Sequence, residues 1–150
     1  KDEVAHYVDL MPDGTHRQYT SIQEAKSVIT APSGGQKLLK QGYHDITGLA
    51  WSGRGTVEKV EVSVDGGRNW RGARLEGPIL PKALTRFHCD WVWQGEEALL
   101  QARVTDSTGY IQPSRAQLVE IRGTRSIYHN NAIQTWRVGV DGEVHNVQLG

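Results

Sequence analysis

Apolar and polar residues alternate most regularly along the stretch VEKVEVSVD, which covers residues 57–65. Within it, Val60, Val62 and Val64 are separated by single polar residues. A period of two places alternate side chains on opposite faces of a strand, one face buried and one wet. We therefore predict a half-buried β-strand at this position.

A tight turn follows this strand directly. Asp65-Gly66-Gly67 is favourable turn chemistry because glycine adopts a positive φ without steric cost, and Trp70 is expected to begin the return strand. The stretch SVDGGRNW, residues 63–70, also fits S-x-D-x-G-x-x-W, a hairpin motif of sialidase-like propellers. A propeller needs several blades with similar motifs, and this motif occurs once in the 150 residues. We interpret it as one hairpin of another β-domain, with Asp65 as a turn former rather than a calcium ligand.

Shorter β-patterns separated by turn residues recur along the rest of the chain. They lie at residues 27–30, at Ile46 with 49–51, and at 85–93, 99–105, 117–122, 135–140 and 143–149. Asp141-Gly142 joins the last two patterns and is a strong hairpin signal. About seven short strands, with a turn signal roughly every ten residues, predict an all-β sandwich. Helical turns are expected at most near residues 18–24 or 126–133.

The N-terminal residues differ from the rest. Residues 1–24 are polar and irregular, and Pro12-Asp13-Gly14 is their clear turn signal. We interpret them as an extended arm or the tail of a preceding domain, and place the folded domain at residues 25–150. Because the sequence begins KDEV, without an initiator methionine or a signal peptide, we read it as a mature chain or a cut fragment.

Composition narrows the classes of function. Lys+Arg and Asp+Glu both number 17, so the net charge is zero, which argues against a nucleic-acid partner. No apolar run has the length needed for a membrane span. The single cysteine, Cys89, excludes an internal disulfide.

The sequence gives little indication of a metal site or of a catalytic nucleophile. The six histidines show no zinc-binding spacing, and no C-x-x-C accompanies them, so no metal site is predicted. Cys89 with His88 beside it would be a nucleophile and base, but adjacent residues in a strand point to opposite faces. We therefore interpret Cys89 as a small buried apolar residue.

Tryptophans allow two interpretations. A row of exposed rings would stack on carbohydrate, whereas buried rings would build the core and an interface, which we favour. The residues in question are Trp51, Trp70, Trp91, Trp93 and Trp136.

A longer block of sequence resembles a known family. GLAWSGRGTVEKVEVSVDGGRNWRGARL, residues 48–75, resembles the C-terminal dimerisation domain of sulfite oxidase-type molybdenum enzymes, in which an A-W-S-G turn precedes a valine-rich strand, a D-G-G turn and a tryptophan. Other segments match as well, one before this block and the rest after it in order, and the resemblance covers residues 24–140. These segments are Ser27 to Thr30 with Pro32, Trp91 and Trp93, Ala102 to Asp106, Tyr110 to Pro113, Ile121 to Gly123, and Trp136 to Val138. The stretch YHNNAIQTWRV at 128–138 and the leading KDEVAHYVDLMPDG are similar to the sulfane dehydrogenase branch of thiosulfate-oxidising (Sox) systems.

The resemblance implies an immunoglobulin-like (E-set) sandwich that forms a homodimer. It also implies an upstream catalytic domain that holds a molybdopterin cofactor through a cysteine, with residues 1–24 as its last residues or a linker. Cys89 does not match that cysteine, so this chain alone is expected to bind no molybdenum and to catalyse nothing.

The same resemblance implies one active-site residue in this domain. Arg122, in the segment that matches the family's L-R-G, would reach the anion pocket of the catalytic domain. A guanidinium suits that role because it offers planar, paired donors to an oxyanion and stays charged. The following segment is longer than usual for the family, and Arg125 and His129 are alternatives for the same role.

The resemblance further implies a periplasmic oxidoreductase acting on sulfane or sulfite-like sulfur, with a c-type cytochrome subunit as electron acceptor. The competing hypothesis is a stand-alone immunoglobulin-like module that binds a protein or a carbohydrate. A stable two-fold dimer with buried tryptophans would favour the first hypothesis, and a monomer with exposed tryptophans the second.

Overall fold

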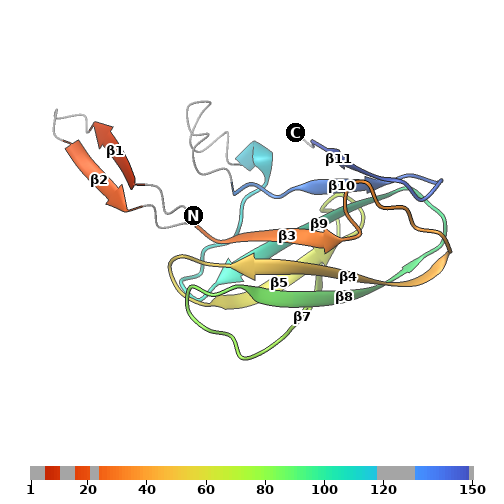
Figure 1. Ribbon diagram of the computed structural model, residues 1–150, viewed down its shortest axis with the longest axis horizontal. Helices are drawn as coiled ribbons and strands as arrows, with labels where there is room; N and C mark the ends of the chain where they lie inside the picture. Colours follow the sequence, from red (N-terminus) through yellow and green to blue (C-terminus); the bar gives the residue numbers. More distant parts are fainter. Residues whose placement is uncertain (1–5, 11–15, 21–23, 118–130, 149–150) are drawn as a thin grey trace.

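The computed structural model describes residues 6–10, 16–20, 24–117 and 131–148. The strands within these ranges are β1 (His6–Leu10), β2 (His16–Thr20), β3 (Lys26–Ala31), β4 (Gly42–Trp51), β5 (Val57–Ser63), β6 (Arg71–Gly72), β7 (Arg74–Leu75), β8 (Thr85–Trp93), β9 (Ala98–Asp106), β10 (Thr135–Val138) and β11 (Val144–Val147). They form a pair β1-β2, a five-stranded sheet in the order β11-β10-β9-β5-β6, and a four-stranded sheet in the order β3-β4-β8-β7. The two larger sheets form the layers of a sandwich (Figure 1), so the predicted all-β fold class is confirmed.

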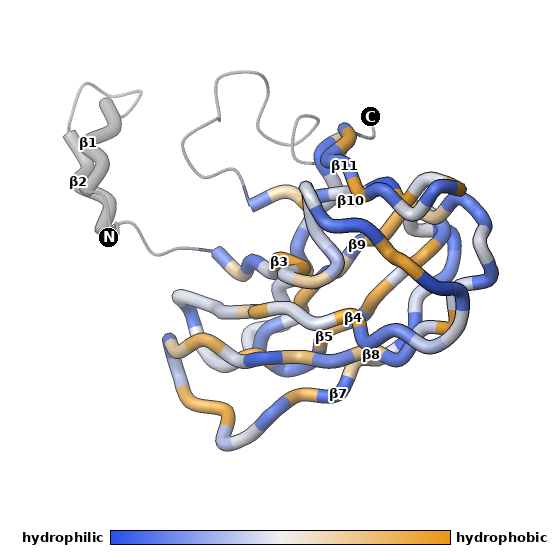
Figure 2. The backbone as a smooth tube through the Cα atoms, turned by 45° about the vertical axis from the view of Figure 1, so that its right-hand side comes forward, coloured by the Kyte–Doolittle hydropathy of each residue, from blue (hydrophilic) through white to orange (hydrophobic). Residues whose placement is uncertain are grey.

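The core lies between the two larger sheets. Hydrophobic and hydrophilic segments alternate along their strands (Figure 2), and the apolar side chains of the inner faces are buried. The fully buried ones include Ile46, Ala50, Val60, Val62, Phe87, Leu100, Val104 and Val138. Burial of each large apolar side chain contributes about 1.5–3 kcal/mol, so these two inner faces hold the layers together.

β8 shows how closely the pattern predicts the structure. It spans Thr85–Trp93 as predicted, and Phe87, Cys89, Trp91 and Trp93 are all buried on its inner face. The polar residues between them lie on the outer face. The interpretation of Cys89 as a buried apolar residue is confirmed.

The turn after β5 is built from its own side chains. Gly66 and Gly67 have φ values of 74° and 93°. The Asp65 carboxylate accepts hydrogen bonds from the Asn69 backbone N–H (2.9 Å) and side-chain amide (2.7 Å), and from the Ser63 hydroxyl (2.7 Å). These bonds, led by the one from the Asn69 side chain, hold the pKa of Asp65 well below its usual range. The hydrogen-bond donors within the hairpin therefore pair with both carboxylate oxygens of Asp65, and its role as a turn former is confirmed.

The placement of Trp70 in the core is wrong. The turn carries Trp70 to the outer face of the β5–β9 pair, where its ring contacts Arg103 and is only partly buried. The return strand β6 begins one residue later, at Arg71. The sequence pattern counts the residue as apolar but does not indicate that the turn brings it over the outer face.

β4 is longer than predicted, because its pattern is interrupted by Gly48. A Cβ atom at Gly48 would lie 2.3 Å from both Phe87 Cζ and the Val28 carbonyl oxygen. Glycine is therefore required for the close approach of the Phe87 ring. The neighbouring residue Leu49 pairs with Val28 of β3 and Arg86 of β8.

The prediction that the N-terminal arm is irregular, with a helical turn near 18–24, is wrong for the strands that the structure describes there. β1 and β2 pair antiparallel, with Tyr7 opposite Tyr19. The runs HYVDL and HRQYT contain good strand formers, but each has only five residues, which is too short to establish a period. The turn signal Pro12-Asp13-Gly14 itself lies outside the described residues.

The remaining predicted elements lie partly inside and partly outside the residues that the structure describes. The strands predicted at 135–140 and 143–149 are present as Thr135–Val138 and Val144–Val147. Of the strand predicted at 117–122, residues 118–122 lie outside the described residues, and residue 117 ends a short helical turn at 115–117. Of the helical turn predicted near 126–133, only residues 131–133 are described, and they are not helical. Among those described, no helix has the length and apolar character needed to cross a bilayer.

Candidate functional site

The predicted site residues Arg122, Arg125 and His129 lie outside the described residues. The structure does describe both ends of the segment that carries them. At its base, the Ile133 backbone N–H donates to the Pro113 carbonyl oxygen at 2.9 Å. The two ends of the segment are therefore side by side.

Gln112 forms the centre of a buried polar network at this base. It is 1% exposed, and its Nε2 donates to the Asn131 carbonyl oxygen at 2.8 Å. Its Oε1 accepts from the Ser27 hydroxyl at 2.7 Å and from the Val104 backbone N–H at 3.3 Å. One side chain thus ties both ends of the segment to β3 and β9.

Asn131 extends the same network toward the start of β3. It is buried, and its Nδ2 donates to the Ala25 carbonyl oxygen at 2.9 Å and to the Tyr110 hydroxyl at 3.0 Å. We call the five residues Ala25, Ser27, Tyr110, Gln112 and Asn131 the base network. Hydrogen bonds in a dry interior are costly to break, because a buried unpaired polar group loses its solvation without compensation. The base network therefore fixes where the segment leaves and rejoins the sandwich.

Asp106 holds the neighbouring loop. Its carboxylate accepts hydrogen bonds from the hydroxyls of Ser52 (2.7 Å) and Thr108 (2.6 Å), and from the backbone N–H of Tyr110 (3.1 Å). Burial of Asp106 raises the pKa of this carboxyl, but the hydrogen bonds together outweigh burial and lower it. The serine of the A-W-S-G turn thus has a physical role in supporting Tyr110, which itself belongs to the base network.

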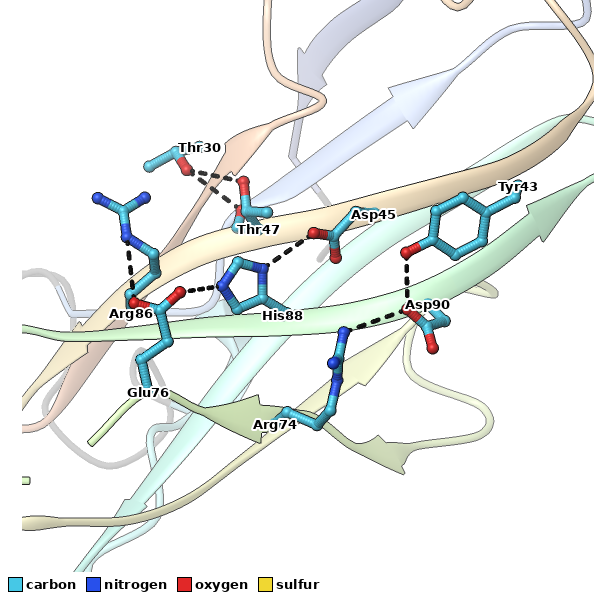
Figure 3. Close-up of polar contacts among 9 residues, drawn as sticks. All are labelled: Thr30, Tyr43, Asp45, Thr47, Arg74, Glu76, Arg86, His88 and Asp90. Carbon is cyan, nitrogen blue, oxygen red and sulfur yellow. Dashed lines mark hydrogen bonds and ion pairs between the residues drawn. The ribbon is translucent and has the colours of Figure 1, made fainter. Parts of the chain in front are cut away.

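A second polar constellation lies on the outer face of the four-stranded sheet (Figure 3). Asp45 and Asp90 are directly opposite each other in the pairing of β4 with β8. Two like charges in this position repel, and each is neutralised by a different partner. His88 Nδ1 lies 2.9 Å from Asp45 Oδ2, while Arg74 Nη2 donates to Asp90 Oδ1 at 3.3 Å.

Further contacts complete this group. Nε2 of His88 contacts the Glu76 carboxylate, and the Tyr43 hydroxyl donates to Asp90 at 2.9 Å. We call these side chains, with Arg86, the outer-face cluster: Tyr43, Asp45, Arg74, Glu76, Arg86, His88 and Asp90. The hydrogen bond to Glu76, followed by the one to Asp45, raises the pKa of His88. The hydrogen bond to Asp90 likewise raises the pKa of Tyr43.

This face carries a groove beside the outer-face cluster. A shallow groove of about 460 Å³ lies between Asp45, Arg74, Leu75, Glu76 and His88. Both ring nitrogens of His88 are occupied by carboxylates, so this ring has no nitrogen free for a metal. Across the described ranges, no group of three or more His, Cys, Asp or Glu side chains is arranged to hold a metal ion.

Cys89 is separated from this polar face. It lies on the inner side of β8 and is 4% exposed, and burial raises the pKa of its thiol. The expectation that His88 and Cys89 point to opposite faces is confirmed, so the pair does not form a nucleophile and base.

Reasoning from the sequence did not identify the base network. Tyr110 and Gln112 drew attention only as part of a matched segment, and Asn131 only as part of the stretch at 128–138. A signal was present, since Gln112 is a polar residue between Ile111 and Pro113, six residues after the end of the largely buried strand β9. Its partners Ser27 and Asn131 are 85 and 19 residues away, and one sequence does not reveal such pairings.

Comparison with known proteins gives consistent results. The family described as the Mo-co oxidoreductase dimerisation domain matches residues 17–136. Sulfite oxidase of Gallus gallus is 35% identical over 120 residues, which is 74% of this chain and 26% of that protein. Mitochondrial sulfite oxidase of Mus musculus is 50% identical over 119 residues, covering 71% and 21% of the two chains.

A solved structure is more similar still. The crystal structure of the sulfane dehydrogenase SoxCD from Paracoccus pantotrophus matches with a TM-score of 0.87 and 54% sequence identity. The match covers 96% of this chain and 37% of that one. The chain therefore spans between about a fifth and two fifths of the length of these relatives.

Proposed function

The chain belongs to the Mo-co oxidoreductase dimerisation domain family, and from that premise we propose that it serves a molybdenum-dependent oxidoreductase acting on sulfur compounds, of the sulfane or sulfite dehydrogenase type. The observation that carries this proposal is the 54% identity to the sulfane dehydrogenase SoxCD across 96% of the chain. Residues 25–150 form the dimerisation domain, and residues 1–24 belong to the linker or to the end of the catalytic domain.

The cofactor belongs outside this chain. In this family's chemistry, molybdenum takes a cysteine thiolate as ligand, and the chain has the single cysteine Cys89. Its sulfur is buried between the sheets and burial raises its pKa, so the described residues do not fit a molybdopterin site. The chain provides the parent enzyme with its dimerisation domain and with one substrate-binding side chain, and no reaction step takes place within it.

That binding group is Arg122, with Arg125 and His129 as alternatives. The base network supports this role because it fixes both ends of the segment against the start of β3. A guanidinium on a segment fixed at both ends can present paired N–H donors to a sulfur oxyanion. A binding site needs such support, because small displacements of a positioning group are costly to the rate.

The assembly follows from the same likeness. The parent enzyme is a homodimer in the periplasm and passes electrons to a c-type cytochrome subunit. The proposal involves no nucleic acid and no insertion into a membrane.

The test uses the protein expressed from its complete gene. We expect the purified protein to contain molybdenum, to sediment as a dimer, and to reduce cytochrome c when given a sulfane or sulfite substrate. The variant Arg122→Ala should keep the molybdenum content and the dimer while the KM for the oxyanion rises, and Arg125→Ala serves as the matched comparison. A protein without molybdenum, or one inactive toward every sulfur substrate, would refute the proposed activity.

The alternative of a stand-alone carbohydrate-binding module receives no support from the rings. Stacking on sugar needs exposed aromatic faces, whereas Trp91 and Trp93 are 2% and 4% exposed. Trp51, Trp70 and Trp136 are partly buried. No row of exposed tryptophans therefore exists among the described residues.

A further inference from the structure

Four side chains from separate parts of the chain meet at the end of the sandwich where the chain enters β3. Glu24 precedes β3, Arg54 lies in the turn between β4 and β5, Tyr110 lies after β9, and Asn131 directly follows the segment that carries Arg122. Each is joined to the next by an ion pair, a cation–π contact or a hydrogen bond. We call Glu24, Arg54, Tyr110 and Asn131 the entry joint.

Arg54 links the first part of this joint to the second. Its Nη2 lies 3.6 Å from Glu24 Oε2, and its guanidinium carbon lies 5.4 Å from the centroid of the Tyr110 ring. The Glu24 side chain is only 12% exposed, so its charge requires a counter-charge nearby. The same guanidinium is attracted to the face of the aromatic ring. Arg54 therefore holds the Tyr110 ring beside the residues that lead into β3.

Tyr110 carries its hydroxyl at a fixed point. Its backbone N–H donates to the Asp106 carboxylate at 3.1 Å, its carbonyl oxygen accepts from the Asp106 N–H at 3.0 Å, and its side chain packs against the core. Asn131 Nδ2 donates to this hydroxyl at 3.0 Å and to the Ala25 carbonyl oxygen at 2.9 Å. Because the sandwich places both acceptors, they set the orientation of the Asn131 amide and the point at which the segment returns to the sandwich.

The Asn131 amide is held in this orientation at a cost in stability. Its Oδ1 is buried and, within the described part of the chain, has no hydrogen-bond partner. A buried acceptor in that state has lost its solvation without compensation. An exception of this kind calls for an explanation, and a role in placing the neighbouring segment supplies one.

We propose that Tyr110 and Arg54 are positioning residues for the oxyanion site, and that they act on the pocket arginine through Asn131. This inference rests on the proposed function for the arginine itself, Arg122, and adds the residues that hold it in place. A guanidinium binds an oxyanion through paired, directional N–H donors, so a displaced segment weakens the binding of any oxyanion, reactive or not. Such a loss of binding raises KM and leaves kcat nearly unchanged.

The test uses the protein from its complete gene, with sulfite as substrate, cytochrome c as electron acceptor and sulfate as an unreactive competitor. Tyr110→Phe removes only the hydroxyl. We expect it to raise the KM for sulfite and the inhibition constant of sulfate by about three- to tenfold, the range for one lost hydrogen bond, with kcat within about twofold of wild type.

Arg54→Ala should raise both constants by about two- to fivefold, because its cation–π contact and its ion pair are partly exposed to solvent. Arg54→Lys should give an intermediate rise, since it keeps a positive charge near Glu24 but loses the planar group over the ring.

Two matched controls lie far from the entry joint. Tyr43→Phe also removes a single hydroxyl, one that donates to Asp90 at 2.9 Å on the outer face of the four-stranded sheet. Arg137→Ala removes a half-exposed guanidinium that pairs with Glu97. Both variants should keep the wild-type KM and the wild-type inhibition constant.

A double-mutant cycle separates positioning from other roles. Tyr110→Phe combined with Arg122→Ala should raise KM no further than Arg122→Ala alone, because the hydroxyl acts through that segment. A fully additive rise would overturn the inference, and so would a Tyr110→Phe protein that melts at a lower temperature but keeps the wild-type KM and inhibition constant. If Arg122→Ala, Arg125→Ala and His129→Ala all keep the wild-type KM, the binding group of the proposed function is refuted instead.

Discussion

The guanidinium carbon of Arg103 lies 4.1 Å from the centroid of the Trp70 ring, on the outer face of the β5–β9 pair. Arg103 also donates from Nε to the Glu61 carboxylate at 2.9 Å. The ring therefore covers a charge pair on the surface of the sheet and adds a cation–π contact to it. Trp70 differs in this respect from Trp91, which lies between the two sheets.

Truncation of these two tryptophans should have unequal costs. We expect Trp91→Ala to lower the free energy of unfolding by about 3–5 kcal/mol, as for a buried aromatic side chain that leaves a cavity. Trp70→Ala should cost only about 1–2 kcal/mol, because its ring is partly exposed and its main specific contact is with Arg103. Urea unfolding of the 150-residue chain measures both. Equal losses would show that Trp70 contributes to the core after all.

The fold was predictable from sequence wherever alternation was complete. TRFHCDWVW alternates from Arg86 to Trp91, with only the outward Val92 apolar after it, and the bounds of β8 followed from this pattern. β4 was recovered only in part, because Gly48 interrupts the pattern for a reason that lies in another strand, the ring of Phe87. The short strands β1 and β2 were not predicted, because five residues do not establish a period.

The candidate site was much less predictable. Arg122 was assigned by resemblance and lies outside the described residues, so its role stays a prediction. Gln112 and Asn131 were not assigned a role at all, because the partners that define them come from β3 and from opposite ends of a segment. A buried polar contact between distant residues leaves no periodic trace in one sequence. The same holds for Asp45 and Asp90, whose opposition depends on strand register.

The thiol of Cys89 should be unreactive in the folded protein. It is buried, and burial raises its pKa, so little thiolate forms near neutral pH and reagents do not reach it. We expect an aromatic disulfide reagent to leave the native chain unmodified and to titrate one thiol per chain after denaturation. Rapid modification under native conditions would contradict the inward placement of Cys89.

Gln112 should contribute strongly to stability despite being polar. Gln112→Leu keeps most of the side-chain volume but leaves the Ser27 hydroxyl, the Val104 N–H and the Asn131 carbonyl without this partner. We expect a loss of about 3 kcal/mol in the free energy of unfolding, because buried polar groups that lose a partner are costly. Gln94→Leu is the matched control, since Gln94 is exposed, and it should change stability by less than about 0.5 kcal/mol. Equal effects of the two variants would remove Gln112 from the base network.

The contact of His88 with two carboxylates should make stability depend on pH in one direction. The hydrogen bonds to Glu76 and then to Asp45 raise the pKa of His88 in the folded protein. Its contribution to stability is therefore fully present below the unfolded pKa of about 6.5 and is lost as the pH rises through the folded pKa. Carboxylates and guanidinium groups as classes do not ordinarily titrate in that range.

Replacement of His88 with glutamine measures this contribution. We expect wild type to exceed His88→Gln in free energy of unfolding by more at pH 6 than at pH 9, because the protonated ring binds both carboxylates and the neutral ring does not attract them as a charge. His145→Gln is the control, since the His145 side chain is 60% exposed and its contact with Glu143 is long, at 3.3 Å. For that variant the difference from wild type should be small at both pH values. A gap for His88→Gln that stays constant from pH 6 to pH 9 would mean that His88 binds Asp45 and Glu76 through neutral hydrogen bonds alone.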